Sequence, residues 1–218
     1  MSDLIIFDLD NTLLNGDSDR NWGIYLAEKN IVDADYLKRS EKFYDNYYSG
    51  NLDIHGFLNF CVEPLKNNSM ELLLETRKSF IEEKIKPIVL EKGFSAVANE
   101  LNNNNNKVII ATATNSFVTR PIADLFGVKD LIATEFEVID NKFTGKVIGA
   151  PCFQEGKVSK VIDWINANGC NLSSTTFYSD SFNDIPLLKK VNTAIIVDGD
   201  DKLIEEANNN GWGCISFR

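Results

Sequence analysis

Two carboxylates two positions apart give the first sign of chemistry in this chain. Asp8 and Asp10 follow the apolar run Leu4–Phe7, a pattern typical of a buried strand whose carboxyl end opens into a site. Side chains alternate along an extended chain, so Asp8 and Asp10 begin on one face unless the backbone turns between them. At roughly 4 Å and an effective dielectric of about 20, their repulsion is on the order of 4 kcal/mol. We therefore expect a cation, a shared proton or a backbone turn to relieve it.

A second polar group follows the apolar run 108–111. Thr112 comes directly after that run, and Thr114 and Asn115 follow. Helix capping is one explanation for the two threonines, and Asn115 or Ser116 would cap the helix predicted next. A phosphate near this helix start would gain from its unpaired N–H groups.

A lysine lies at an unusual place in the helix predicted from Glu155 to Asn168. Lys157 is at the start of that helix, where a cation opposes the helix macrodipole at a cost of about 0.3–1 kcal/mol. A bound anion would cancel this cost. Lys160 is the other lysine of this helix that could bind such an anion, but Lys157 is preferred because a side chain at the helix start can reach inward.

A second acidic group follows the strand predicted at 175–178. It contains Asp180, Asn183 and Asp184. An acidic helix cap, with Pro186 in the first turn, is the alternative explanation. Such a cap accounts for one of the two carboxylates but not for both.

The elements that must position these residues include a long helical stretch. From 22 to 85, apolar residues recur at helical spacing without a strand signal. Helix caps are expected at Asp33 and Ser69, and breaks at 49–51 and Glu63–Pro64. This stretch predicts a helical subdomain inserted after the first strand.

The rest of the chain alternates strands and helices. A hairpin is expected with its turn at Asp140–Asn141. We predict an α/β core made of residues 1–14 and 87–218, with active residues at strand carboxyl ends. Residues 15–86 form the inserted helical subdomain.

Composition excludes several classes of protein. The chain has 218 residues and a net charge of −10, and no basic cluster is longer than Lys189–Lys190, which argues against nucleic acid as a partner. Acidic residues near the start exclude a secretory leader. No apolar run reaches the roughly 18 residues that a membrane-spanning helix needs. The four cysteines are scattered and indicate neither a zinc site nor disulfides. We expect a cytoplasmic monomer or homodimer without a membrane partner. The aromatic group Tyr44, Tyr47 and Tyr48 is interpreted as core or as a dimer patch.

The sequence DLDNTL, which begins at Asp8, resembles the DxDxT motif of the haloacid-dehalogenase-type phosphatases. The resemblance implies that Asp8 attacks phosphorus and that Asp10 is the general acid and base. It also implies that the hydroxyl of Thr112, with the backbone N–H of Ala113, holds the phosphoryl oxygens. Thr112 is the better match because it directly follows the apolar run. Lys157 is then the lysine that contacts both the nucleophile and the phosphoryl group.

The same resemblance implies a magnesium site. Its metal ligands would be Asp8, the backbone carbonyl of Asp10, and Asp180. Asp184 would bind the metal directly or support its ligands, and Asn183 would orient either carboxylate. Oxygen-only ligation completed by waters and a substrate phosphate suits Mg²⁺.

The motifs occur in order through the whole chain and imply a Rossmann-like parallel sheet in a three-layer α/β/α core, with an inserted C1-type helical cap. The cap is similar to that of subfamily IB, the phosphoserine phosphatase-like and histidinol-phosphate phosphatase-like branch. The implied activity is Mg²⁺-dependent hydrolysis of a small phosphomonoester. Asp17 lies near the acidic position that contacts the substrate amine in phosphoserine phosphatases. The other charged residues of the cap that could contact the substrate are Asp19, Arg20, Arg39 and Arg77. None clearly matches the arginine that binds the substrate carboxylate in phosphoserine phosphatases, so phosphoserine and histidinol phosphate both remain open as substrates.

Two other classes of protein also use an acidic pocket. A non-catalytic phosphate- or magnesium-binding module could dispense with Asp10, Thr112 or Lys157, and all three are present. A receiver-like signalling domain is phosphorylated on an aspartate, but it would lack the helical insertion and the second aspartate of the first motif. Both remain alternatives to the hydrolase.

Overall fold

The computed structural model describes residues 3–218, apart from the side chains of Ala34 and Tyr48, so the interpretation of Tyr48 lies outside the described residues. Within that range, seven strands form one sheet that is parallel except for its β3–β4 pair. In their order across the sheet, the strands are β4 (Lys142–Ile148), β3 (Asp130–Ile139), β2 (Asn106–Asn115), β1 (Asp3–Phe7), β5 (Thr175–Ser179), β6 (Thr193–Val197) and β7 (Gly213–Ile215). Because β1 lies between β2 and β5, its run Leu4–Phe7 is buried on both faces.

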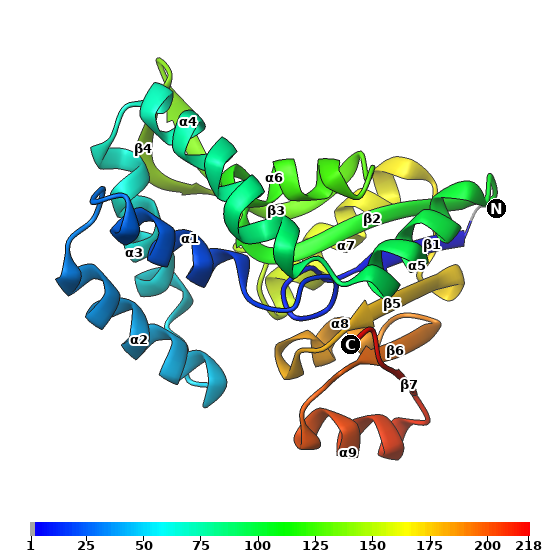
Figure 1. Ribbon diagram of the computed structural model, residues 1–218. Coiled ribbons are helices and arrows are strands. Elements are labelled where there is room, and N and C mark those ends of the chain that lie inside the picture. The colour runs from blue at the N-terminus through cyan, green and yellow to red at the C-terminus, as the bar shows by residue number, and fades with distance from the viewer. Residues whose placement is uncertain (1–2) are drawn as a thin grey trace.

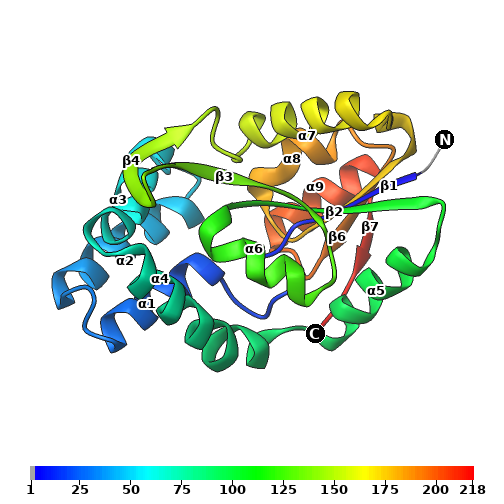
Figure 2. The ribbon, with the colours of Figure 1, turned by 90° about the horizontal axis from the view of Figure 1, so that it is seen from above.

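Helices cover both faces of the sheet, which confirms the predicted three-layer α/β core (Figure 2). Leu4 and Ile6 pack in one cluster with residues of three helices, and Ile5 and Phe7 pack in the other. The helices on the Leu4 side are α7 (Glu155–Asn168), α8 (Ile185–Leu188) and α9 (Asp201–Asn210), and those on the Phe7 side are α5 (Glu91–Asn102) and α6 (Ser116–Leu125).

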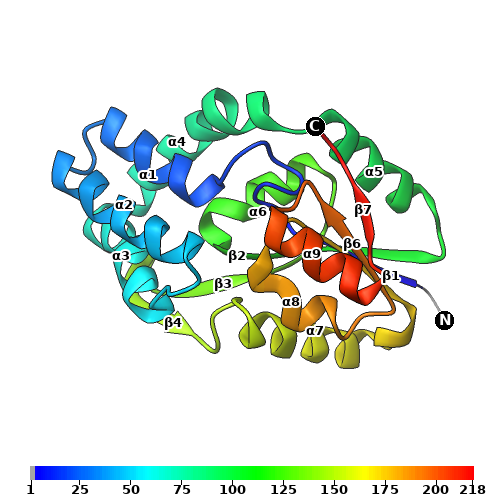
Figure 3. The same ribbon diagram turned by 90° about the horizontal axis from the view of Figure 1, so that it is seen from below.

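The residues after β1 form a group of helices at one end of the molecule (Figures 1 and 3). They are α1 (Ser18–Glu28), α2 (Ala34–Tyr48), α3 (Ile54–Asn67) and α4 (Met70–Phe80), followed by a π-helix, Ile81–Ile85, and a 3-10 turn, Lys86–Ile88. Asp33 and Ser69 cap α2 and α4 as predicted. In the described part of the chain, no helix is both long and apolar enough to span a membrane.

The predicted helix break at Glu63–Pro64 was wrong, because α3 runs through both residues to Asn67. Proline removes the N–H that would bond the carbonyl of Phe60, at a cost of about 3 kcal/mol within a helix. Its neighbours Cys61 and Leu65 are buried in the core. Packing therefore outweighs the local preference against helix.

The segment that leaves the sheet after β1, residues 13–15, pairs with the segment that returns to it, residues 88–90, and we call this pairing the crossing. Leu14 and Val89 form an isolated antiparallel bridge. The N–H of Asn15 donates to the carbonyl of Ile88 at 2.7 Å, and the N–H of Leu90 donates to the carbonyl of Leu13 at 3.0 Å. The predicted boundaries after 14 and before 87 lie close to this crossing, and we propose that the inserted helical cap begins and ends there.

The predicted hairpin is formed by β3 and β4, with its turn at Asp140 and Asn141. Both turn residues have positive φ, 49° and 60°, which matches the right-handed twist of a two-residue hairpin. The hairpin extends from the sheet, and β4 packs beside α3 of the helical group (Figure 1). It therefore adds a second contact between sheet and cap.

Candidate active site

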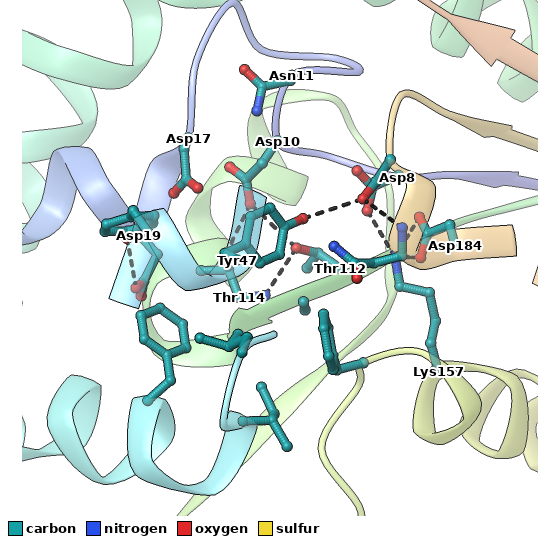
Figure 4. A pocket seen from close by; sticks show the side chains of 18 residues that line it. Asp8, Asp10, Asn11, Asp17, Asp19, Tyr47, Thr112, Thr114, Lys157 and Asp184 are labelled. Carbon is teal, nitrogen blue, oxygen red and sulfur yellow. Dashed lines mark hydrogen bonds and ion pairs between the residues drawn. The ribbon is translucent and has the colours of Figure 1, made fainter. Parts of the chain in front are cut away.

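The carboxyl ends of β1, β2 and β5 meet the first turn of α7 and enclose a cavity there (Figure 4). Asp8 directly follows β1, and its N–H donates to the carbonyl of Tyr178 in β5 at 2.9 Å. Asp8 is 6% exposed, and Asp184 and Lys157 are 3% exposed. The strand order reverses at β1, and open α/β sheets bind ligands at such a point.

Lys157 reaches from the first turn of α7 to two carboxylates. Its Nζ lies 2.9 Å from Oδ1 of Asp8 and 2.7 Å from Oδ1 of Asp184. Burial acts to lower the pKa of Lys157, but the charges of Asp184 and Asp8 outweigh it and hold that pKa well above its usual value. Lys160, the rival candidate, donates to the carbonyl of Ala133 at 3.1 Å. The structure therefore places Lys157 beside Asp8.

The start of α7 is brought close by a residue without a side chain. A Cβ at Gly156 would lie 2.1 Å from the carbonyl oxygen of Pro151, so only glycine fits at this backbone approach. Gln154, which directly precedes α7, is bound to the turn after β5, because its Nε2 donates to Oδ1 of Asn183 at 3.1 Å. Asn183 lines the cavity.

Asp180 lies in the same group of carboxylates as Asp8 and Asp184, and it is held by Thr12 of the DLDNTL sequence. The hydroxyl of Thr12 donates to Oδ1 of Asp180 at 3.0 Å and accepts from its backbone N–H at 3.0 Å. Burial and the charge of Asp8 raise the pKa of Asp180 well above its usual value. Burial also raises the pKa of Asp8 to about 7, against the lowering effect of Lys157 and with the help of Asp184 and Asp10. The carboxylates therefore repel one another, and a bound cation would relieve the repulsion.

The oxygen donors of this group suit magnesium. Among the described residues, no three acidic, histidine or cysteine side chains form a cluster that could hold a metal ion. Mg²⁺ usually takes one or two carboxylates and completes its octahedron with waters and substrate phosphate. Asp8 and Asp180 fit this pattern, with the backbone carbonyl of Asp10 as a further donor. Asp184 fits a supporting position better, because Lys157 and the hydroxyl of Ser179, at 2.7 Å, already bind it.

Asp10 has its own set of partners, separate from those of Asp8. Its Oδ1 accepts from the N–H of Ser18, the first residue of α1, at 2.6 Å. Its Oδ2 accepts from the hydroxyl of Thr114 at 2.9 Å and from that of Thr112 at 3.5 Å. Burial and the charge of Asp17 raise the pKa of Asp10 to about 6, although the Ser18 and Thr114 bonds act to lower it. The pKa of Asp10 is therefore raised above the ordinary value of an aspartate.

Thr114 is a site residue that the sequence interpretation assigned only to capping. Strand β2 continues through the polar residues to Asn115, which then caps α6. Thr112 and Thr114 are two positions apart in this strand, so their side chains share a face. This spacing of two residues was the signal in the sequence that could have identified Thr114 as a residue of the site. Thr112 is buried, and both Thr112 and Ala113 line the cavity.

Two further carboxylates lie at the cap end of the cavity, away from Asp8 (Figure 4). Asp17 caps α1 by accepting from the N–H of Arg20 at 2.8 Å. Burial and the charge of Asp19 raise the pKa of Asp17 to about 7. Asp19 accepts from the hydroxyl of Tyr44 at 3.2 Å and from the thiol of Cys61 at 3.2 Å, and burial raises its pKa to about 6.

Two aromatic residues of α2, Tyr44 and Tyr47, face this cavity. Tyr44 is buried and binds Asp19, as described above. The hydroxyl of Tyr47 lies 3.2 Å from Oγ of Ser181, in the turn after β5, and its ring lies near that of Phe153. Both tyrosines line the cavity. The structure thus gives Tyr44 and Tyr47 a place in the wall of the site.

Negative charge predominates along the cavity wall. Among the described residues that line it, the acidic ones are Asp8, Asp10, Asp17, Asp19 and Asp184, and the basic one is Lys157.

The three arginine candidates have other partners. The Arg20 guanidinium lies over the ring of Tyr44 at 5.4 Å, and Arg39 pairs with Glu63 at 2.9 Å. Arg77 donates to the carbonyl of Phe117 at 2.6 Å. None of these three side chains is among the described residues that line the cavity.

Comparison with known proteins agrees with this geometry. The family model of haloacid dehalogenase-like hydrolases matches residues 5–189. A protein of Neisseria meningitidis serogroup C named histidinol-phosphatase is 40% identical to this chain, and the match covers all of both chains.

Solved structures show the same fold. A protein of unknown function from Bordetella pertussis Tohama I superposes with a TM-score of 0.92 at 35% identity, over all of both chains. A substrate-bound phosphoserine phosphatase superposes with a TM-score of 0.73 at 23% identity, over 99% of this chain and 93% of that one. This last likeness concerns the fold.

Proposed function

Because this chain belongs to the haloacid dehalogenase-like hydrolases and is a phosphatase of that family, we propose that it hydrolyses a small phosphomonoester through an aspartyl-phosphate on Asp8, with Mg²⁺ as cofactor. Membership in the family sets aside the receiver-like alternative and the non-catalytic module. The proposal is supported by the arrangement of Asp8, Asp10 and Lys157 around one buried cavity.

Asp8 is proposed as the nucleophile because it is buried and faces a fixed cation. The Lys157 ammonium, 2.9 Å away, holds the carboxylate in place and offsets its charge as the phosphate approaches. Attack of an Asp8 oxygen on phosphorus forms the P–O bond of an acyl phosphate and breaks the bond to the leaving alcohol.

Asp10 is proposed as the general acid and base. A carboxyl group with a pKa of about 6 can give its proton to the leaving alcohol and then accept one from the water that attacks the acyl phosphate. Ser18 and Thr114 fix its orientation through both steps. The hydroxyl of Thr112 and the N–H of Ala113 are the groups proposed to bind phosphoryl oxygens.

The proposed magnesium ligands are Asp8, Asp180 and the carbonyl of Asp10, with Asp184 in support and Asn183 orienting the carboxylates. When bound there, Mg²⁺ would supply positive charge that lets an anionic nucleophile meet an anionic ester. Thr12 keeps Asp180 in place for this role.

The charge of the cavity favours one class of substrate. Asp17 and Asp19 present carboxylates at the cap end, and Lys157, the basic residue among the described ones that line the cavity, is paired with Asp8 and Asp184. A substrate with an amine is attracted by such a wall, whereas a substrate carboxylate would be desolvated without a partner. We therefore infer a phosphorylated amino alcohol without a carboxylate, such as histidinol phosphate. The name of the Neisseria meningitidis relative supports this choice.

Two esters that differ by one carboxylate test the substrate proposal. Phosphoethanolamine and phosphoserine share the phosphate and the amine, so their kcat/KM ratio isolates the effect of the carboxylate. We expect phosphoethanolamine to be preferred by at least about tenfold, and histidinol phosphate to exceed both. Asp17→Asn and Asp19→Asn should each weaken the preference for amine-bearing esters. A preference for phosphoserine would contradict the proposal.

A further inference from the structure

A guanidinium outside the cavity holds the loop that follows Asp10. Nη2 of Arg218 donates to the carbonyl of Asn11 at 3.2 Å, and its Nε donates to Oδ1 of Asn15 at 3.2 Å. Its Nη1 lies 3.1 Å from Oδ2 of Asp198, which follows β6. We propose that Arg218 is a positioning residue for Asp10, acting through the loop Asn11–Gly16.

This loop needs an external support because its backbone is in a conformation that few residues adopt. Asn11 has a φ of 59°, in the left-handed region. Its N–H donates to the carbonyl of Gly16 at 3.0 Å, which closes the loop on itself. The Arg218 fork joins the beginning of the loop, at Asn11, to its far side, at Asn15. The Asn11 carbonyl belongs to the peptide between Asn11 and Thr12, so a shift of that peptide would reach Asp10 through the backbone of Asn11.

The support is itself anchored to the sheet. Asp198 is 13% exposed and accepts from the N–H of Phe217 at 3.0 Å as well as from Arg218. Partial burial acts to raise the pKa of Asp198, but hydrogen bonds from Ser216 and Phe217 and the charge of Arg218 hold that pKa below its usual value. The Phe217 ring stacks on Tyr178 of β5 at 6.4 Å. The segment that carries Arg218 is therefore fixed to β5 and β6.

The consequence is specific to catalysis and rests on the proposed function of Asp10. Arg218 does not line the cavity that holds Asp8 and Lys157, and it faces the neighbouring groove instead. Its loss should leave substrate binding nearly unchanged and should misplace the proton-transferring group. Small misplacements of such a group lower rates by up to about 100-fold.

Arg218→Ala tests the proposal, with Arg218→Lys and Arg120→Ala beside it. Arg120 is a matched control because its guanidinium also pairs with an aspartate, Asp124, and donates to two backbone carbonyls, those of Val128 and Lys129. We expect Arg218→Ala to lower kcat by about 10- to 100-fold with KM changed less than about threefold. Arg218→Lys, which keeps the charge but loses the fork, should give an intermediate kcat. Arg120→Ala should keep the wild-type kcat.

Amide hydrogen exchange gives a second readout that does not depend on turnover. Exchange in residues 11–16 should rise at least tenfold in Arg218→Ala and stay unchanged in Arg120→Ala. An unchanged kcat in Arg218→Ala, or an equal loss in both alanine variants, would overturn the proposal. If the wild type hydrolyses no ester, the proposed function fails, and exchange alone decides: a selective rise at 11–16 supports the anchoring role and its absence overturns it.

Discussion

At the scale of single residues, the two ends of the cavity differ in charge: one has a lysine among its carboxylates, and the other has carboxylates without a basic residue among the described residues that line it. Lys157 faces Asp8 and Asp184. Asp17 and Asp19 are partly exposed and have raised pKa values, chiefly because their carboxylates are desolvated. The first end is suited to hold an anionic phosphate and the second to hold a cation brought by the substrate. Each end leads to a prediction about stability.

Removing Lys157 leaves two buried carboxylates without their counter-charge. For Lys157→Ala we expect the free energy of unfolding to fall by about 3–5 kcal/mol at neutral pH, together with loss of phosphate release. Lys160→Ala removes a lysine that donates to the carbonyl of Ala133, and its expected loss is about 1 kcal/mol. Urea unfolding of both variants measures the difference, and equal losses would count against the role given to Lys157.

Asp17→Asn tests the cap end of the cavity through the pH dependence of the free energy of unfolding. The native pKa of Asp17 is about 7 against an ordinary value of 3.8, so the unfolded state releases a proton that the native state keeps. Wild-type stability therefore falls as pH rises from about 4 to about 7. Asn keeps the helix cap without the charge, so the variant should gain on the order of 1 kcal/mol over the wild type across that window, allowing for solvent screening.

The control for this experiment is Asp33→Asn, which replaces an exposed N-cap of the neighbouring helix α2. A parallel pH dependence in both variants would show that the capping positions, and not the desolvated charge of Asp17, cause the effect.

The sequence predicted the site residues that follow strands and missed those that depend on packing between distant segments. Asp8 and Thr112 were found because each follows an apolar run. Two partners of Asp19 come from α2 and α3, 25 and 42 positions away, and a third, Asn115, is 96 positions away. Arg218 contacts Asn11 across 207 positions. Local periodicity carries no information about such contacts.

At the scale of elements, the start of α7 determines where Lys157 lies. A glycine at 156 permits the backbone to pass close to the carbonyl of Pro151. The helix itself was predicted with its bounds, since its apolar spacing and the terminal Gly169 are local features. The run of α3 through Pro64 was not predictable in that way, because burial against the core decided it.

Gly156→Ala should displace the start of α7. A Cβ placed 2.1 Å from a carbonyl oxygen forces a backbone shift, for which we expect a loss of about 1–3 kcal/mol in the free energy of unfolding. We also expect a larger fall in kcat/KM than in any surface variant, because Lys157 moves with the helix. Gly213→Ala is the control, since its nearest neighbour would be 3.9 Å away. Thermal unfolding and initial rates measure both effects.

At the scale of the whole molecule, the chain passes between the sheet and the helical cap at one paired crossing, and the β3–β4 hairpin packs against the cap as well. The paired segments at Leu14 and Val89 lie next to Asp10 in the sequence and to the π-helix Ile81–Ile85. The helical group supplies Asp17, Asp19 and the two tyrosines to the cavity wall, and the sheet supplies Asp8, Asp10 and Thr112, the groups that we propose to act in the reaction. We therefore propose that specificity belongs to the cap and chemistry to the core.

The most direct test of the central claim is to trap the intermediate on Asp8. Rapid acid quenching of enzyme with ³²P-labelled histidinol phosphate and Mg²⁺, followed by borohydride reduction and peptide mass spectrometry, would locate the phosphorylated residue. We predict labelled enzyme within the first turnover and homoserine at position 8, with no label in Asp8→Asn or after removal of Mg²⁺. Magnesium-dependent release of phosphate with no label on the enzyme, or with the label on another residue, would contradict the proposed mechanism.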